Sequence, residues 1–237
     1  SLRATTATPP PPVPNASLPP SPSSHDAPPV LHPSGVERPF RIAINGYGRI
    51  GRCYLRALHE AGLAERYRIV AINEPADLAS IAYLTRFDST HGRFPGVVER
   101  SERELIVDGH AIHVSHASTP EEVDWTALGL DLVVECSGQY GGRRDLQRFI
   151  AAGCPRLLLS HPGNGAEDVD VTVVFGINED ELHGPERLVS NASCTTNAVV
   201  PVLDCLHREI GIEQALLTTL HSVMNDQPLI DGYHHDD

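Results

Sequence analysis

The residues best suited to chemistry surround Cys194, in the segment SNASCTTN at 190–197. Hydroxyl and amide side chains flank this thiol, whereas a structural cysteine usually packs among apolar neighbours. Apolar residues recur at helical spacing over 198–210 and predict a helix there. Cys194 then lies near a helix N-terminus, where free N–H groups and the helix dipole favour a thiolate or a substrate oxyanion. We therefore interpret this segment as a reactive site.

A nucleophilic thiol needs a base, and His221 is the candidate. It follows the run ALLTTL at 215–220, which predicts a strand that could return the imidazole to Cys194. Taken singly, each residue has an ordinary structural interpretation, as a cysteine at a helix start and a histidine at a strand end. The octapeptide and the histidine together favour nucleophilic catalysis.

Three glycines form a second motif, G-x-G-x-x-G, at Gly46, Gly48 and Gly51. A short apolar strand is predicted at 41–45, directly before the motif, and a helix at 49–61 after it. Such glycines permit a tight turn and let the backbone approach a pyrophosphate, which the helix N-terminus binds. A lone motif of this kind is more often a surface turn, so the flanking strand and helix are what favour dinucleotide binding.

An acidic residue completes this pattern. Glu74 follows a second predicted strand at 68–73 and lies 23 residues after Gly51. An acid at this distance is placed to accept hydrogen bonds from the hydroxyls of the adenosine ribose. Because an arginine is the residue that accommodates the extra phosphate of NADP, Glu74 favours NAD as the cofactor.

The two motifs together resemble the glyceraldehyde-3-phosphate dehydrogenase superfamily, whose signatures include N-G-x-G-R-I-G-R and A-S-C-T-T-N. The resemblance runs from about Phe40 to the end of the chain. Within the superfamily, four short stretches look more like erythrose-4-phosphate dehydrogenase than the glycolytic enzyme. These are AINE at 71–74, YGGR at 140–143, SHPG at 160–163 and HSVMNDQ at 221–227.

The resemblance implies a role for each matching residue. Cys194 is expected to be the nucleophile and His221 the group that activates it, with Ser193 and Thr195 in contact with the substrate. The expected cofactor-binding residues are Asn45, Gly46, Gly48, Arg49, Ile50, Gly51, Glu74, Ser137 and Gly138.

The activity that the resemblance implies is NAD-dependent oxidation of a phosphorylated aldehyde through a cysteine thioester. For the erythrose-4-phosphate type, water hydrolyses the thioester to 4-phosphoerythronate, an early intermediate of pyridoxal phosphate synthesis. The alternative within the superfamily is the glycolytic enzyme, in which phosphate attacks the thioester. An alternative of another class is an NAD-binding or thiol-reactive module without turnover. The resemblance also implies a homo-oligomer, a tetramer, in the cytoplasm.

Three regions are expected along the chain. Residues 1–39 hold 12 of the 20 prolines and show no apolar periodicity, which predicts a disordered extension. Their Ser and Thr content leaves a plastid transit segment as an alternative. Residues 40–192 are expected to form a Rossmann NAD-binding domain of the α/β class, with a doubly wound parallel sheet. Its later strands are predicted at 131–136, 156–160 and 171–177. Residues 193–237 are expected to begin an α+β catalytic domain that continues beyond this chain, so we expect little turnover from residues 1–237 alone.

Composition argues against several other functions. The net charge of −13 and the absence of a basic cluster disfavour nucleic acid as a partner. No apolar run approaches the roughly 18 residues of a membrane span. We also expect no metal site. A strand over 110–116 would separate the histidines spaced along it, and the terminal pair His234 and His235 has the character of an exposed end.

The five cysteines form no C-x-x-C pair, which is typical of a reducing compartment. The four cysteines other than Cys194 are expected to be packing residues.

Overall fold

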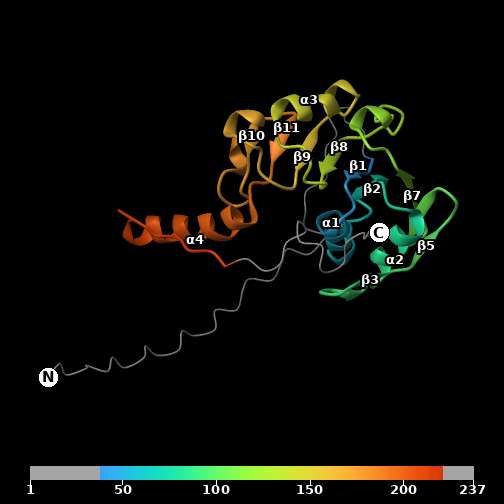
Figure 1. The fold of residues 1–237 in the computed structure, drawn as a ribbon. Helices are drawn as coiled ribbons and strands as arrows, with labels where there is room; N and C mark the ends of the chain where they lie inside the picture. The colour runs from blue at the N-terminus through green and yellow to red at the C-terminus, as the bar shows by residue number, and fades with distance from the viewer. Residues whose placement is uncertain (1–37, 221–237) are drawn as a thin grey trace, which may run out of the picture.

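The strand expected at the start of the folded region is β1 (Phe40–Asn45), which lies at the centre of a nine-stranded sheet. The computed structural model describes residues 38–220 (Figure 1). Ile42 and Ile44 of β1 pack into one apolar core and Ala43 into another, as alternation along a strand requires. The sheet is therefore buried on both faces.

The strand order is β10-β11-β9-β8-β1-β2-β7-β6-β5. All neighbours from β10 to β7 pair in parallel, whereas β5, β6 and β7 form an antiparallel meander. The remaining strands of this sheet are β2 (Tyr67–Asn73), β5 (Val98–Arg100), β6 (Glu104–Val107), β7 (His110–Ser115), β8 (Leu132–Glu135), β9 (Leu157–Leu159), β10 (Val171–Thr172) and β11 (Leu188–Ser190). A separate two-stranded hairpin consists of β3 (Phe87–Asp88) and β4 (Gly92–Arg93).

Helices cover both faces of the sheet. The first core contains side chains of α1 (Arg49–Glu60) and α2 (Leu78–Arg86), and the second contains side chains of α3 (Arg143–Ala151). Three short 3-10 helices lie in the connections, at Pro120–Glu122, Ala166–Asp168 and Glu179–Glu181. The last helix within residues 38–220, α4 (Cys194–Ile210), follows β11 and extends away from the sheet (Figure 1), and none of its residues is buried. These elements form the predicted α/β fold, a Rossmann domain followed by the start of a second domain.

The direction of the chain reverses around β1. The chain passes from β1 to β2 and β7 on one side, and returns to β8, β9 and β11 on the other. In doubly wound sheets, ligands bind at this switch point, outside the carboxyl ends of the strands. The carboxyl ends of β1 and β8 are therefore the place to look for a site.

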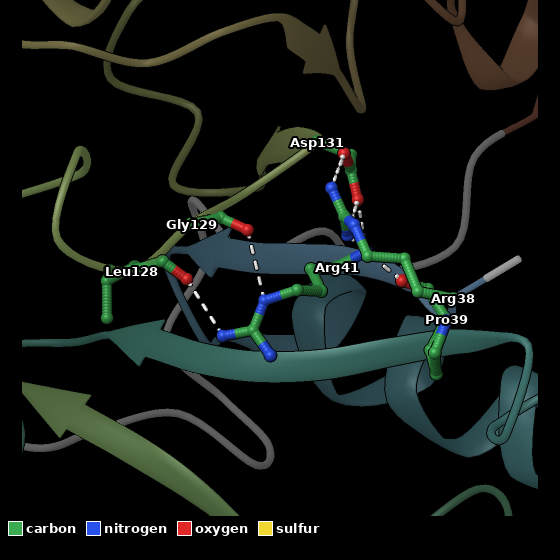
Figure 2. Close-up of polar contacts among 6 residues, drawn as sticks. All are labelled: Arg38, Pro39, Arg41, Leu128, Gly129 and Asp131. Atoms are coloured by element: carbon green, nitrogen blue, oxygen red, sulfur yellow. Dashed lines mark hydrogen bonds and ion pairs between the residues drawn. The ribbon is translucent and has the colours of Figure 1, made fainter. Parts of the chain in front are cut away.

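The opposite, amino end of β1 is held by charged side chains (Figure 2). Arg38 makes two hydrogen bonds of 2.7 Å to the carboxylate of Asp131, which also accepts one from the Arg41 backbone N–H at 2.8 Å. The Arg41 guanidinium donates to the carbonyl oxygens of Leu128 and Gly129. The residues before β1 are thereby tied to the segment that leads into β8.

Up to residue 214, the predicted elements match the observed ones with two exceptions. The strand expected over 171–177 ends at Thr172, because the Asn178 side chain accepts a hydrogen bond from the Val174 N–H at 2.8 Å and Gly176 has a φ of +84°. The helix expected over 198–210 begins earlier, at Cys194. Within residues 38–220, no helix is long and apolar enough to cross a membrane.

Candidate active site

The glycine motif forms a turn from β1 into α1, as the sequence predicts. Gly46 has a φ of +85°, a conformation that favours glycine, and its N–H donates to the Asn73 carbonyl at 2.9 Å. Gly51 packs against the same turn, because a Cβ at this position would lie 2.5 Å from the Gly46 carbonyl oxygen. Gly46 and Gly51 thus permit a close approach that larger residues would prevent.

The N-terminus of α1 is suited to an anion. The first helical N–H to reach a backbone acceptor is that of Arg52, which donates to the Gly48 carbonyl at 3.1 Å. The N–H groups of Arg49, Ile50 and Gly51 precede it, Gly48 provides no side-chain cap, and the first turn has no acidic residue. This helix end fits the pyrophosphate of a dinucleotide.

Glu74 follows β2 and reaches back to the glycine turn. Its Oε2 accepts a hydrogen bond from the Tyr47 N–H at 2.7 Å, and its own N–H donates to the Ser115 carbonyl at 2.9 Å. Its backbone carbonyl lies 2.8 Å from Nδ1 of His116. The structure therefore places the expected ribose ligand beside the expected pyrophosphate site, with one carboxylate oxygen already bonded to the turn.

Ser137 and Gly138 form the turn after β8, and this turn lies against the glycine turn. A Cβ on Gly46 would be 2.4 Å from the Ser137 backbone nitrogen, so the two backbones are in direct contact. The Cys136 N–H donates to the Asn45 carbonyl at 2.7 Å. Gly138 has a φ of +71° and open space around its Cα. Two separate groups of expected cofactor-binding residues thus meet at one edge of the sheet.

A buried polar network, which the sequence interpretation missed, lies beneath these turns. Its members are Asn45, Asn73, Ser115 and Glu135, the last residues of β1, β2, β7 and β8. Asn45 is 5% exposed and both ends of its amide are hydrogen-bonded inside this network. The sequence feature that could have revealed this network is the polar residue at the end of each of these apolar strands.

Cys194 is the first residue of α4 and is exposed. The hydroxyl of Ser193 caps the helix, because it accepts a hydrogen bond from the Thr196 N–H at 3.0 Å. Asn197 donates to the Asn191 carbonyl at 2.7 Å, which fixes the loop between β11 and the helix. The predicted position of the thiol at a helix N-terminus is confirmed. The Ser193 hydroxyl is engaged in the cap, and Thr195 lies half-buried beside it.

The thiol lies at the same edge of the sheet as the glycine turn, because β11, β9, β8 and β1 run in parallel. The sheet spacing of about 4.8 Å between strands puts the end of β11 about 10 Å from the end of β8. Cys194, four residues after the end of β11, is therefore on the side of the sheet where the glycine turn and Ser137 lie.

The other cysteines differ from Cys194. Burial raises the pKa of Cys136 and of Cys154 to about 12, and burial likewise raises the pKa of Cys53. These three are packing residues, as expected. The same expectation is wrong for Cys205, which is exposed because it lies on α4, where no residue is buried.

The strand expected over 215–220 is also wrong. These residues have no regular secondary structure, and Leu216 and Leu220 are almost fully exposed. A strand requires a hydrogen-bonded neighbour, and no strand among residues 38–220 pairs with this run. His221, the expected base, lies outside the described residues, as do the proline-rich segment up to residue 37 and His234 and His235.

The histidines at 110, 113 and 116 have different surroundings. His110 pairs with Glu65 at 3.2 Å and His116 contacts the Glu74 carbonyl. Within the part of the chain that the structure describes, no group of three His, Cys, Asp or Glu side chains could hold a metal ion.

Comparison with known families gives two matches. Residues 40–143 match the family model described as glyceraldehyde 3-phosphate dehydrogenase, NAD binding domain. Residues 193–237 match the model described as glyceraldehyde 3-phosphate dehydrogenase, C-terminal domain. The first match includes the glycine turn, Glu74 and the turn after β8, and identifies NAD as the cofactor. The second begins at Ser193, next to Cys194.

Proposed function

Since the chain belongs to the glyceraldehyde-3-phosphate dehydrogenase family, and is thereby an NAD-dependent oxidoreductase at family level, we propose that it oxidises D-erythrose 4-phosphate to 4-phosphoerythronate. The observation that carries the proposal is the placement of Cys194 at a helix N-terminus on the same sheet edge as the glycine turn. The SHPG and HSVMNDQ segments favour erythrose 4-phosphate over glyceraldehyde 3-phosphate.

The proposed reaction begins with the Cys194 thiolate, whose sulfur attacks the aldehyde carbon and forms a thiohemiacetal oxyanion. N–H groups at the start of α4 stabilise this negative charge. The cofactor supplies the hydride acceptor. When the oxyanion collapses, the hydride leaves the former aldehyde carbon and a thioester remains on Cys194. Water then attacks the thioester, which releases the carboxylic acid and regenerates the thiol.

His221 has the proposed role of proton acceptor and donor for the thiol. Ser193 and Thr195 are proposed to lie near the bound substrate. Glu74 is proposed to bind the ribose through the carboxylate oxygen that does not accept from Tyr47. Gly46, Gly48, Arg49, Ile50, Gly51, Ser137 and Gly138 are proposed to surround the rest of the cofactor. Asn45 is proposed to lie beneath it, with its side-chain amide bonded inside the buried network.

His161, in the SHPG segment, is tied to the loop that precedes Cys194. Its Nδ1 lies 2.8 Å from the Pro162 carbonyl oxygen, to which it donates a hydrogen bond. This Nε2 is buried and has no hydrogen-bond partner among residues 38–220. Ser190, four residues before Cys194, donates to the His161 carbonyl at 2.8 Å.

The test is to measure NADH formation by the protein expressed from its complete coding sequence, with each of the two aldehydes and with or without inorganic phosphate. We expect a higher kcat/KM for erythrose 4-phosphate and no requirement for phosphate. A preference for glyceraldehyde 3-phosphate together with a phosphate requirement would establish the glycolytic activity instead. NAD binding without NADH formation from either aldehyde would favour a module without turnover.

The cellular setting of the proposed enzyme is the cytoplasm, with a plastid as the alternative, and its proposed pathway is pyridoxal phosphate synthesis. We propose a homo-oligomer, a tetramer, that binds neither nucleic acid nor membranes.

A further inference from the structure

Glu135 is a fully buried acidic residue that the proposed chemistry does not use. It ends β8 directly before the Cys136–Ser137 turn, and its exposed fraction is 0%. A buried carboxyl group is strongly unfavourable unless hydrogen-bond donors surround it. The donors around Glu135 therefore indicate what this residue does in the fold.

The direction of the hydrogen bonds that lead to Glu135 can be fixed from a backbone group. The Ala117 N–H, which can only donate, lies 2.9 Å from one side-chain atom of Asn73, and that atom must therefore be Oδ1. Ser115 donates its hydroxyl to the same oxygen at 2.8 Å. The Asn73 Nδ2 then faces Asn45 and donates to its Oδ1 at 2.8 Å.

The same reasoning continues to the carboxyl group. With Oδ1 of Asn45 accepting, its Nδ2 donates to Oε2 of Glu135 at 2.5 Å. The Ser137 N–H donates to Oε1 at 2.7 Å, and the Ser137 hydroxyl donates to the same oxygen. Glu135 is thus the final acceptor of a chain in which each donor points toward it. Burial raises the pKa of this carboxyl group, while the hydrogen bonds from Ser137 and Asn45 act in the opposite direction.

The network also bridges the two cofactor turns at their point of contact. Asn45 directly precedes Gly46, and Ser137 directly precedes Gly138. The Gly46 Cα and the Ser137 backbone pack so closely that a Cβ would not fit between them. A change in the hydrogen bonds of Glu135 would therefore alter the relative position of the two turns.

We propose that Glu135 is a positioning residue for the cofactor, which as the final acceptor of the buried chain holds the Ser137–Gly138 turn in register with the glycine turn. NAD then meets both turns already placed, and less binding energy is spent on ordering them. The proposal deepens the cofactor part of the proposed function and rests on it.

The direct test is Glu135→Gln, which keeps the size of the side chain but replaces one acceptor with a donor. The new NH₂ group must face either the Asn45 amide nitrogen or the Ser137 N–H, so two donors meet in a buried site. We expect NAD to bind at least about tenfold more weakly by titration calorimetry, because binding must then also bring the two turns into register against a mispaired buried donor.

The rescue variant is the double substitution Asn45→Asp with Glu135→Gln. The carboxylate at 45 can accept from Asn73 and from the new amide at 135, whose oxygen still accepts from Ser137. Every hydrogen bond is retained, with one reversed in direction, and the charge of the site is unchanged. We expect NAD affinity to return to within about threefold of the wild type, whereas Asn45→Asp alone places two carboxylates together and weakens binding.

Trp125→Phe is the matched control, because Trp125 is equally buried and donates to the Pro120 carbonyl at 2.8 Å, away from both turns. It should lower stability in urea without changing NAD affinity in the folded state. Unchanged affinity in Glu135→Gln, or no rescue in the double variant, would overturn the proposal while wild-type binding still supports the proposed function. A wild-type protein that does not bind NAD would overturn both. If Glu135→Gln does not fold, the NAD affinity of the double variant compared with that of the wild type tests the proposal.

Discussion

The contact between the two turns predicts a large effect for Gly46→Ala. A methyl group at this position would lie 2.4 Å from the Ser137 nitrogen and 2.5 Å from its Cα, and neither backbone atom can move without displacing β8. Forcing alanine to a φ of +85° costs about 1–2 kcal/mol, and overpacking typically costs about 1–3 kcal/mol. We therefore expect the free energy of unfolding to fall by about 2–5 kcal/mol.

Gly92→Ala separates these two contributions. Gly92 has a similar φ of +71°, but a Cβ there meets no atom within 4 Å. Its substitution should show the backbone cost of about 1–2 kcal/mol alone. Urea unfolding followed by circular dichroism measures both variants. If Gly46→Ala and Gly92→Ala lower the free energy of unfolding equally, the steric contact between the turns does not exist as described.

Three further predictions concern stability and reactivity. Burial raises the pKa of Tyr47 to about 12, so between pH 10 and 12 the unfolded state loses a proton that the native state keeps, and stability falls as the pH rises. In urea unfolding, Tyr47→Phe should therefore show a shallower fall in stability across this pH range. An identical profile for the variant and the wild type would contradict this role of Tyr47. Iodoacetamide should label Cys194 much faster than the buried Cys154, as peptide mass spectrometry can measure, and equal rates would argue against a reactive thiol at the start of α4. Asp131→Ala should lower the free energy of unfolding in urea by about 1–3 kcal/mol, because three donors lose their acceptor. Asp204→Ala, which breaks an exposed ion pair within α4, should lower it by less than about 0.5 kcal/mol. Comparable losses in the two variants would refute the role of Asp131 at the start of β1.

The part of the site that the sequence predicted is the part encoded locally. The strand, the glycine turn and α1 follow one another without a gap, so periodicity and the conformational freedom of Gly46 suffice to place them. The body of α4 is predictable for the same reason, since apolar residues recur at helical spacing over 198–210, whereas its start at Cys194 is set by the Ser193 cap, which the apolar spacing does not reveal.

The part that could not be predicted depends on residues far apart in the chain. Glu135 and Asn45 are 90 positions apart, and the sheet order that brings them together cannot be inferred from either segment alone. The run at 215–220 shows the converse error, because its composition favours a strand but pairing depends on a neighbour. Similarly, β10 ends where the Asn178 side chain bonds to Val174, which strand propensity does not reveal.

The central claim is that NAD binds across the carboxyl ends of β1, β2 and β8, and hydrogen–deuterium exchange tests it most directly. With saturating NAD, we predict slower exchange at the amides of 46–51 and 137–139, and unchanged exchange at 63–66, which precede β2 at the opposite edge of the sheet. Protection confined to the amino edge, or no protection in the presence of bound NAD, would contradict the account.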